Sequence, residues 1–336
     1  KVAPTKTPIV IGKLIDMDAS EDFIQSLLNS VMAMCPIAPL VDVCESRNRL
    51  RMIQPWLEAR LREGSQDPEL HNAIGKIYIS NNTNAQEFLL RDQFYNSKVI
   101  GQFCEKVDPF LAFLAYRRAN GACDDDLIRV TNENGLFKDQ ARYLVERMDD
   151  NLWGKVLIPE NEHQKELVDQ IVNTALPECK NPEMVSRTVK AFMEAEMPEA
   201  LLDLLERLIL QGTEFSNNPS LQNLLIITGL KAAPERVPDY IERLDKFDAP
   251  KLAMHCLDTA HPEEAFLIYK KVNMPVEAVM VLIQNIKDIN RAIEFAERCQ
   301  NNLVWSKVAK AELDCNMVDE AITAYISAQD PTTFMD

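Results

Sequence analysis

The sequence predicts an all-α fold, a superhelical solenoid of about ten stacked αα-hairpins of about 30 residues each, grouped in blocks of about 150 residues. Three observations predict it. A pattern centred on alanine returns at regular intervals, Pro-Glu pairs stand ahead of helical patterns, and the alternating β-branched pattern of strands is nearly absent. Each hairpin would hold two helices of roughly 10 to 12 residues joined by tight turns.

An alanine ahead of an apolar stripe marks the second helix of each predicted hairpin. Neighbouring copies of this pattern lie about 27 to 29 residues apart, and the wider gaps are about two such steps. A small side chain at this position lets the paired helices approach closely, while apolar residues at i, i+3 and i+4 form the buried stripe. The predicted structural repeat positions are Ala85, Ala112, Ala141, Ala200, Ala265, Ala292 and Ala321.

Proline followed by glutamate marks helix starts within the same period. The Pro-Glu pairs begin at Pro68, Pro182, Pro198, Pro234 and Pro262. Proline suits the first helical position because its missing N–H has no intrahelical partner there, and glutamate in the first turn complements the positive end of the helix dipole. Asp67 and Asn181, which precede two of these prolines, are predicted N-caps. We therefore interpret these carboxylates as parts of helix starts rather than as acid–base groups.

A second, longer period indicates how the hairpins are grouped. The segment that ends at Val156 resembles the one that ends at Val308, which places Trp153 and Trp305 about 150 residues apart, close to five hairpins. Together with Trp56, these tryptophans are predicted core anchors of their hairpins. The predicted blocks are a first block over residues 1–153, a complete second block over 154–304 and the truncated start of a third over 305–336.

Composition and charge exclude several classes of protein. The 336 residues are 46% hydrophobic and 26% charged, as in a folded globular protein. The formal net charge of −16 would repel a phosphate backbone, so nucleic acid is not an expected partner. No apolar stretch approaches the ~18 to 20 residues of a membrane-spanning helix, so no membrane insertion is expected. The chain starts at Lys1 without a signal peptide, and we expect it to be a segment of a longer protein.

The motifs that resemble chemical sites are incomplete. Glu160 and His163 form one Glu-x-x-His half-motif of a di-iron site without its second copy, and the cluster from His255 to His261 falls in a predicted helix–turn–helix. The run from Asp124 to Asp126 lacks the alternating ligands of an EF-hand and reads as a helix start. We therefore predict no catalytic residue, no cofactor and no metal, and expect that the protein is not an enzyme.

Long segments of the sequence resemble the clathrin heavy-chain family, from about residue 20 to the end. Segments of this length and order are far more specific than a short motif. They are RNRLRMIQPWLEARL (47–61), HNAIGKIYI (71–79), FYNSKVIGQFCEKVDPFLAFLAYRRA (94–119), NENGLFKDQARYLVER (132–147), NLLIITGLKAAPERVPDYIERLDKFDAP (223–250) and INRAIEFAERCQNNLVWSKVAKAEL (289–313).

The resemblance implies a structural coat protein of intracellular vesicle transport and endocytosis. Its legs are helical-hairpin solenoids that pack against one another, so that weak contacts multiplied over a polyhedral lattice hold the coat together. By the order of its segments, this chain resembles the distal leg toward the knee. The implied partners are other heavy-chain legs and, mostly outside this segment, the clathrin light chain. The implied location is cytoplasmic, on the cytoplasmic face of coated pits and coated vesicles.

Two other binding functions stay open at this stage. A scaffold subunit of a vacuolar-sorting or tethering complex would use the same type of repeat, and only trimerisation and cage formation by the full chain would discriminate between the two. A tetratricopeptide-type peptide receptor would need an inner groove with polar clamps, which the sequence does not show.

Overall fold

The structure, a computed structural model, describes residues 4–31 and 34–329. Within these ranges the chain forms 22 α-helices and no strand. Two helices recur about every 30 residues, so that eleven helix pairs stand where about ten were predicted. The predicted all-α, hairpin-repeat fold is confirmed.

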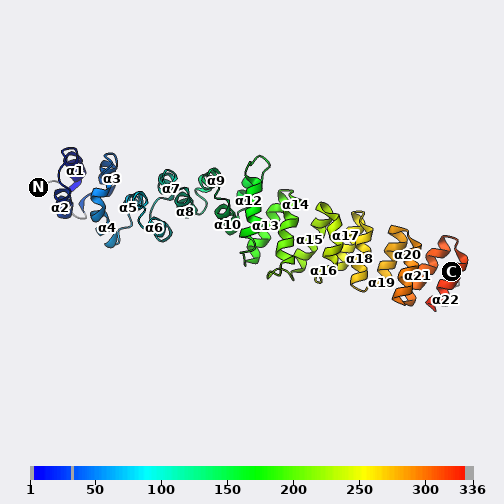
Figure 1. Cartoon of the computed structure of the whole chain (residues 1–336). Helices are drawn as coiled ribbons and strands as arrows, with labels where there is room; N and C mark the ends of the chain where they lie inside the picture. Colours follow the sequence, from blue (N-terminus) through cyan, green and yellow to red (C-terminus); the bar gives the residue numbers. More distant parts are fainter. Residues whose placement is uncertain (1–3, 32–33, 330–336) are drawn as a thin grey trace. The chain divides into compact units, whose positions relative to one another are not determined.

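The chain divides into two compact units, and the first comprises Lys1–Tyr143. Figure 1 shows its helices in blue and cyan, following one another in chain order. They are η1 (Pro4–Lys6), α1 (Thr7–Asp16), α2 (Glu21–Val31), α3 (Ile37–Glu45), η3 (Leu50–Ile53), α4 (Gln54–Arg62), α5 (Pro68–Asn81), α6 (Ala85–Arg91), α7 (Ser97–Glu105), α8 (Pro109–Arg117), α9 (Asp124–Glu133) and the greater part of α10 (Phe137–Arg147).

The second unit comprises Leu144–Asp336, so that α10 contains the boundary. Its helices run from green to red in Figure 1, again in chain order. They are α11 (Asp150–Val156), α12 (Gln164–Gln170), η4 (Ile171–Ala175), α13 (Pro182–Glu194), α14 (Pro198–Leu210), α15 (Pro219–Ala232), η5 (Pro234–Arg236), α16 (Val237–Arg243), α17 (Ala249–Asp258), α18 (Pro262–Lys271), α19 (Pro275–Val281), η6 (Leu282–Ile286), α20 (Ile289–Cys299), α21 (Asn302–Asp314) and α22 (Val318–Ala328). These two units are not the predicted sequence blocks of about five hairpins. The blocks stay a prediction.

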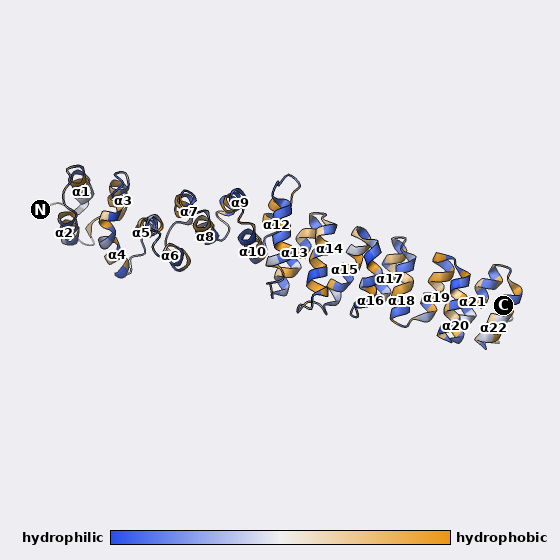
Figure 2. Ribbon diagram, viewed as in Figure 1, coloured by the Kyte–Doolittle hydropathy of each residue, from blue (hydrophilic) through white to orange (hydrophobic). Residues whose placement is uncertain are grey.

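Packing within each unit is local along the chain. Helices contact their neighbours in the chain; α7 contacts α8, for example, and α17 contacts α18. Helices also contact the helix two places further on, as in the pairs α5 and α7, and α16 and α18. Individual helices carry both hydrophobic and hydrophilic residues (Figure 2), and the apolar ones form the stripe that these contacts bury. A unit of this kind is stabilised hairpin by hairpin rather than by one central core.

The predicted helix starts are confirmed. The carboxylate of Asp67 accepts a hydrogen bond from the N–H of Glu69 at 3.0 Å, and the side chain of Asn181 accepts one from the N–H of Glu183 at 2.9 Å. Four of the five Pro-Glu prolines begin α-helices α5, α13, α14 and α18, and Pro234 begins the 3₁₀-helix η5 ahead of α16. These caps satisfy N–H groups that have no partner inside the helix.

Two glycines lie in direct contact with an aromatic ring of the next helix. A Cβ atom on Gly101 in α7 would overlap the ring of Tyr116 in α8, and one on Gly75 in α5 would lie 2.8 Å from the ring of Phe88 in α6. The aromatic ring of the second helix therefore lies against the bare backbone of the first. These contacts bring the two helices of a hairpin closer together than any larger side chain would allow.

Candidate assembly surfaces

Six of the seven predicted repeat alanines are buried between helices. Ala85 has an exposed fraction of 4%, and that of the other five does not exceed 1%. Ala200 differs because it lies partly exposed at a groove between α12 and α14. The role of these alanines in setting the repeat stays a prediction.

The three tryptophans have different surroundings. Trp56 and Trp153 are 2% exposed, and the ring of Trp153 meets the ring of Phe192 edge-on at 6.4 Å between centroids. Trp305 is only partly buried, which departs from its predicted place in the core. The difference has a physical reason. Trp153 on α11 is covered by α13, two helices further on, whereas no helix two places after α21 lies within the described residues.

A ladder of ion pairs, absent from the sequence predictions, links successive hairpins. Its members lie 28 to 31 positions apart, with N···O distances of 2.6 to 3.3 Å, and they are Arg47–Asp16, Lys76–Glu45, Arg236–Glu206 and Arg291–Glu263. The hydrogen bond from Arg291 lowers the pKa of the Glu263 carboxyl. Each pair is partly exposed, so solvent screens its attraction and the pair contributes little to stability. Opposite charges one repeat apart were the signal in the sequence that could have revealed the ladder.

The cysteine thiols are mostly buried and unreactive. Burial raises the pKa of Cys44, Cys104 and Cys256 to about 12 and that of Cys35 to about 11. These thiols therefore stay protonated at neutral pH and are weak nucleophiles and metal ligands.

The residues of the incomplete motifs lie in helices or close to helix starts. Asp124 to Asp126 form the first turn of α9, Cys256 is buried in α17, and His261 immediately precedes α18. Glu160 and His163 precede α12. Among the residues that the structure describes, no group of three or more His, Cys, Asp or Glu side chains is arranged to hold a metal ion.

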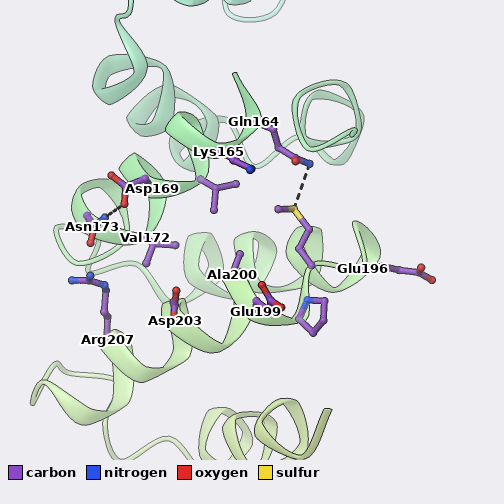
Figure 3. A pocket seen from close by; sticks show the side chains of 13 residues that line it. Gln164, Lys165, Asp169, Val172, Asn173, Glu196, Glu199, Ala200, Asp203 and Arg207 are labelled. Carbon is purple, nitrogen blue, oxygen red and sulfur yellow. Dashed lines mark hydrogen bonds between the residues drawn. The ribbon is translucent and has the colours of Figure 1, made fainter. Parts of the chain in front are cut away.

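In the second unit, a groove of about 550 Å³ lies between α12 and α14 (Figure 3). Its apolar lining comes from Val168, Val172, Met197, Pro198 and Ala200. Its charged side chains are Lys165, Asp169, Glu196, Glu199, Asp203 and Arg207. We call this feature the α12–α14 groove.

The end of α12 shapes this groove. There the helix widens into the π-helical turn η4, in which the N–H of Leu176 bonds to the carbonyl of Ile171 at 3.1 Å. This turn packs against α14 and brings Val172 and Asn173 to the groove. The Asn173 amide donates to the Asp169 carboxylate (Figure 3). Single π-helical turns of this kind occur often at functional sites.

A polar contact lies among the residues that line the groove. The amide of Gln164 donates to the carbonyl of Leu157 at 2.8 Å and lies 3.6 Å from the sulfur of Met197 (Figure 3). Gln164 thereby connects α12 to the residue that precedes α14.

The charges of the α12–α14 groove have no ion-pair partners. None of its four carboxylates and two cations forms an ion pair within residues 4–31 and 34–329. A comparable groove of about 340 Å³ between α18 and α20 differs, because there Arg291 pairs with Glu263 at 2.6 Å and Arg298 with Glu294 at 3.8 Å. The α12–α14 groove thus combines an apolar lining with unpaired charge.

The first unit has a groove of opposite character, about 430 Å³ in volume, lined by residues of α2, α3, η3, α5 and α7. Lys76 pairs there with Glu45 at 2.6 Å and lies 5.9 Å from the centre of the Phe103 ring. Arg49 and Arg51 are exposed at the same groove and form no ion pair with any described residue. With the carboxylates Glu21 and Glu45 in its lining, three cations face two anions, so this basic groove carries a small positive excess on a chain of formal net charge −16.

Comparison with known proteins decides the family. A family model described as Clathrin, a region in clathrin and VPS, matches residues 28–168 and 176–320. Over 336 residues the chain is 54% identical to clathrin heavy chain 1 of Oryza sativa subsp. japonica, 51% to the clathrin heavy chain of Dictyostelium discoideum and 47% to clathrin heavy chain 2 of Homo sapiens. The chain belongs to the clathrin heavy-chain family.

This clathrin-family chain spans about a fifth of the length of the curated relatives it matches, since it aligns over its whole length with 20% of each. The family model alone covers both clathrin and vacuolar-sorting proteins, whereas these relatives are clathrin heavy chains. The alternative of a vacuolar-sorting or tethering subunit is therefore not favoured. In the described part of this clathrin-family chain, no helix has the length and hydropathy needed to span a membrane.

Proposed function

We propose that this chain is a segment of the clathrin heavy-chain leg, the distal leg toward the knee, and that it packs against other legs to build the polyhedral lattice of coated vesicles. The observation that carries the proposal is identity of 47–54% to clathrin heavy chains over all 336 residues. The hairpin array supports it, because each hairpin packs mainly on its neighbours and leaves the outer faces of its helices available to other legs.

The proposed role is mechanical rather than catalytic. Lattice contacts that are individually weak hold a coat in aggregate and still permit its disassembly. The basic groove at Arg49 and Arg51 suits one such contact, because segments of charge −16 otherwise repel one another and a local basic site attracts an acidic neighbour. The ion-pair ladder supports the same role by joining successive hairpins within each unit.

The proposal extends to partners and location. We expect heavy-chain trimerisation in the full-length protein, light-chain binding mostly outside this segment, and a cytoplasmic location on coated pits and vesicles. We also propose sequence blocks of about five hairpins. The two segments matched by the family model, residues 28–168 and 176–320, are of similar length and support that grouping.

A chimera tests the proposal. The chain would replace the matching fifth of a relative such as the rice clathrin heavy chain 1, and the purified chimera would be examined for trimers by sedimentation and for cages by electron microscopy. We expect trimers and closed cages, and fewer cages when Arg49→Glu and Arg51→Glu are introduced. A helical-repeat array of the same length from an unrelated protein serves as the matched control. It should leave trimers intact and prevent closed cages.

The same assay can contradict the proposal. Trimers of the chimera that fail to form cages, while the parent forms them under the same conditions, would mean that this segment does not supply lattice contacts. If Arg49→Glu and Arg51→Glu leave the yield of cages unchanged, the segment still has the role of a leg, but the basic groove does not supply one of its lattice contacts.

A further inference from the structure

We propose that the α12–α14 groove is a docking site for a cationic amphipathic helix of a partner protein that is not a clathrin leg. This inference goes beyond the leg-packing role, because it concerns a different surface and a different class of partner. It rests on the shape of the groove, the sign of its charges and the absence of ion pairs around it within the described residues.

The shape of the groove suits a helix. Along α14 its charged residues recur every four positions, at Glu199, Asp203 and Arg207, and along α12 they recur likewise at Lys165 and Asp169. The groove therefore follows the helix axes over eight residues of α14, or about 12 Å, which corresponds to two helical turns. A third helix laid between α12 and α14 would place side chains at i, i+3, i+4 and i+7 on the apolar lining.

The lining can accept apolar side chains of different shapes. The partly exposed Ala200 leaves the base of the groove open, since a larger residue there would fill the space that an incoming side chain needs. Met197 is flexible and adapts to the partner that packs on it. The volume of about 550 Å³ is that of a site for a few side chains rather than for a large domain.

The charges that line the groove indicate that its occupant is positively charged. Four carboxylates and two cations line the groove, and within the described residues none of them is neutralised by an ion pair. A helix with lysine or arginine beside its apolar stripe would pair with Glu199 and Asp203 on α14 and would be steered by the negative field of the chain. Anionic helices would meet repulsion from both the groove and the remainder of the surface.

A second copy of this chain is the less favoured occupant. Each copy carries a formal net charge of −16, so its average surface is repelled by an acidic groove. The basic groove of the first unit is the place where an acidic leg is attracted, as proposed above. The charge of the α12–α14 groove thus favours a basic partner of another kind.

Fluorescence anisotropy with designed peptides tests the inference on the whole 336-residue chain. The probe is a fluorescein-labelled peptide of about 18 residues with leucines at i, i+3, i+4 and i+7 and lysines beside them, long enough to form a helix. A second peptide has the same leucines and glutamate in place of lysine. We expect the cationic peptide to bind, more weakly at high salt, and the anionic peptide to bind at least about tenfold more weakly.

Two groove variants and a matched control locate the binding. Glu199→Lys with Asp203→Lys reverses the charge of one wall of the groove, and Ala200→Trp fills its base. Each change should weaken binding of the cationic peptide at least about tenfold. The control reverses two exposed carboxylates outside the groove, Glu242→Lys with Glu297→Lys, and should leave binding unchanged. Circular dichroism melts verify that each variant is folded. The wall variant keeps its side chains exposed, so it tests the site even if the tryptophan variant fails to fold.

Several outcomes would overturn the inference. These are no binding of the cationic peptide up to about 1 mM, equal binding of both peptides, or binding that neither groove variant weakens. Sedimentation velocity on the same variants addresses the second-copy alternative. Loss of self-association in the wall variant, without loss of peptide binding, would assign the groove to another leg. Failure of peptide binding leaves cage formation by the chimera unaffected, so the two proposals fail separately.

Discussion

Ala265 and Ala200 occupy equivalent places in the predicted repeat but differ in their surroundings. Ala265 is fully buried in α18, whereas Ala200 is partly exposed at the α12–α14 groove. We expect Ala265→Asp to lower the free energy of unfolding by about 3 to 5 kcal/mol, because it buries a carboxylate that has no partner. Ala200→Asp should cost less than about 1 kcal/mol, since its carboxylate can stay hydrated. Urea titrations followed by circular dichroism would measure both.

A third variant tests whether burial rather than position decides the result. Ala112 is also fully buried, so Ala112→Asp should resemble Ala265→Asp. Equal and small losses in all three variants would remove these alanines from the core of their hairpins.

Glu312 is a buried carboxylic acid on α21. It is 2% exposed, and within the described residues its Oε2 atom has no hydrogen-bond partner. Burial, with a smaller effect of the nearby Glu320 charge, raises the pKa of Glu312 above its ordinary value of 4.5. The protonated form is thus more favoured in the folded state than in the unfolded chain. Its contribution to stability is complete below pH 4.5 and is lost as the pH rises through the pKa of the folded state.

We therefore expect Glu312→Gln to raise the free energy of unfolding at pH 7 by on the order of 1 kcal/mol, and the gain to shrink toward pH 4. Denaturant titrations at a series of pH values would measure the difference. Glu297→Gln, at an exposed position of α20, is the control and should have little effect at any pH. A gain at pH 7 that persists unchanged at pH 4 would show that ionisation of Glu312 is not its cause.

At the scale of the helices, glycine has opposite roles at two positions. Gly101 in α7 lies against the Tyr116 ring, whereas no described atom lies within 4 Å of the Cβ position of Gly154 in α11. We expect Gly101→Ala to destabilise the chain by about 1 to 3 kcal/mol, because the ring must move. Gly154→Ala should stabilise it by about 0.5 to 1 kcal/mol, since alanine favours the helix and meets no obstacle. Thermal melts of the pair check the signs, and a stabilising Gly101→Ala would refute the close crossing of α7 and α8.

The helices show what could be predicted from the sequence. Helix starts depend on adjacent residues, so Asp67 and Asn181 could be predicted as caps from two or three neighbouring letters. The hairpin period could be predicted because each hairpin repeats the same pattern of helix starts and apolar residues. The π-helical turn η4 was not predicted, because one widened turn leaves the apolar spacing of a seven-residue helix almost unchanged.

The α12–α14 groove and the two exceptions among the candidate residues were missed for a related reason. The exposure of Ala200 and Trp305 depends on which other helices cover them, and a pattern within one helix carries no information on the spacing to the next. The unpaired charges of the groove could not be identified either, since a spacing of one repeat can suggest which charges pair, as in the ladder, but does not show which charges are left without a partner.

At the scale of the whole chain, stability should vary along the array because each hairpin depends on its neighbours. Helices α17 and α18 are flanked on both sides by other helices of the second unit, whereas α22 is the last helix described. Leu313, Val318, Ile322 and Ile326, on α21 and α22, have exposed fractions of 44%, 51%, 43% and 72%. These side chains leave α22 with less buried apolar surface to hold it in place.

Native-state hydrogen exchange followed by mass spectrometry would resolve this difference. We expect amides of α22 to open with a free energy at least about 2 kcal/mol lower than those of α17 and α18. The reason is that, among the described helices, α22 packs on α21, whereas α17 and α18 pack on helices at both sides. Ile322→Ser changes a side chain of α22 that is 43% exposed, so it should leave the exchange of α17 and α18 unchanged and serves as the control. Equal protection of all these helices would mean that the second unit unfolds as one cooperative body. The interfaces between neighbouring hairpins would then be strong enough to couple the whole unit.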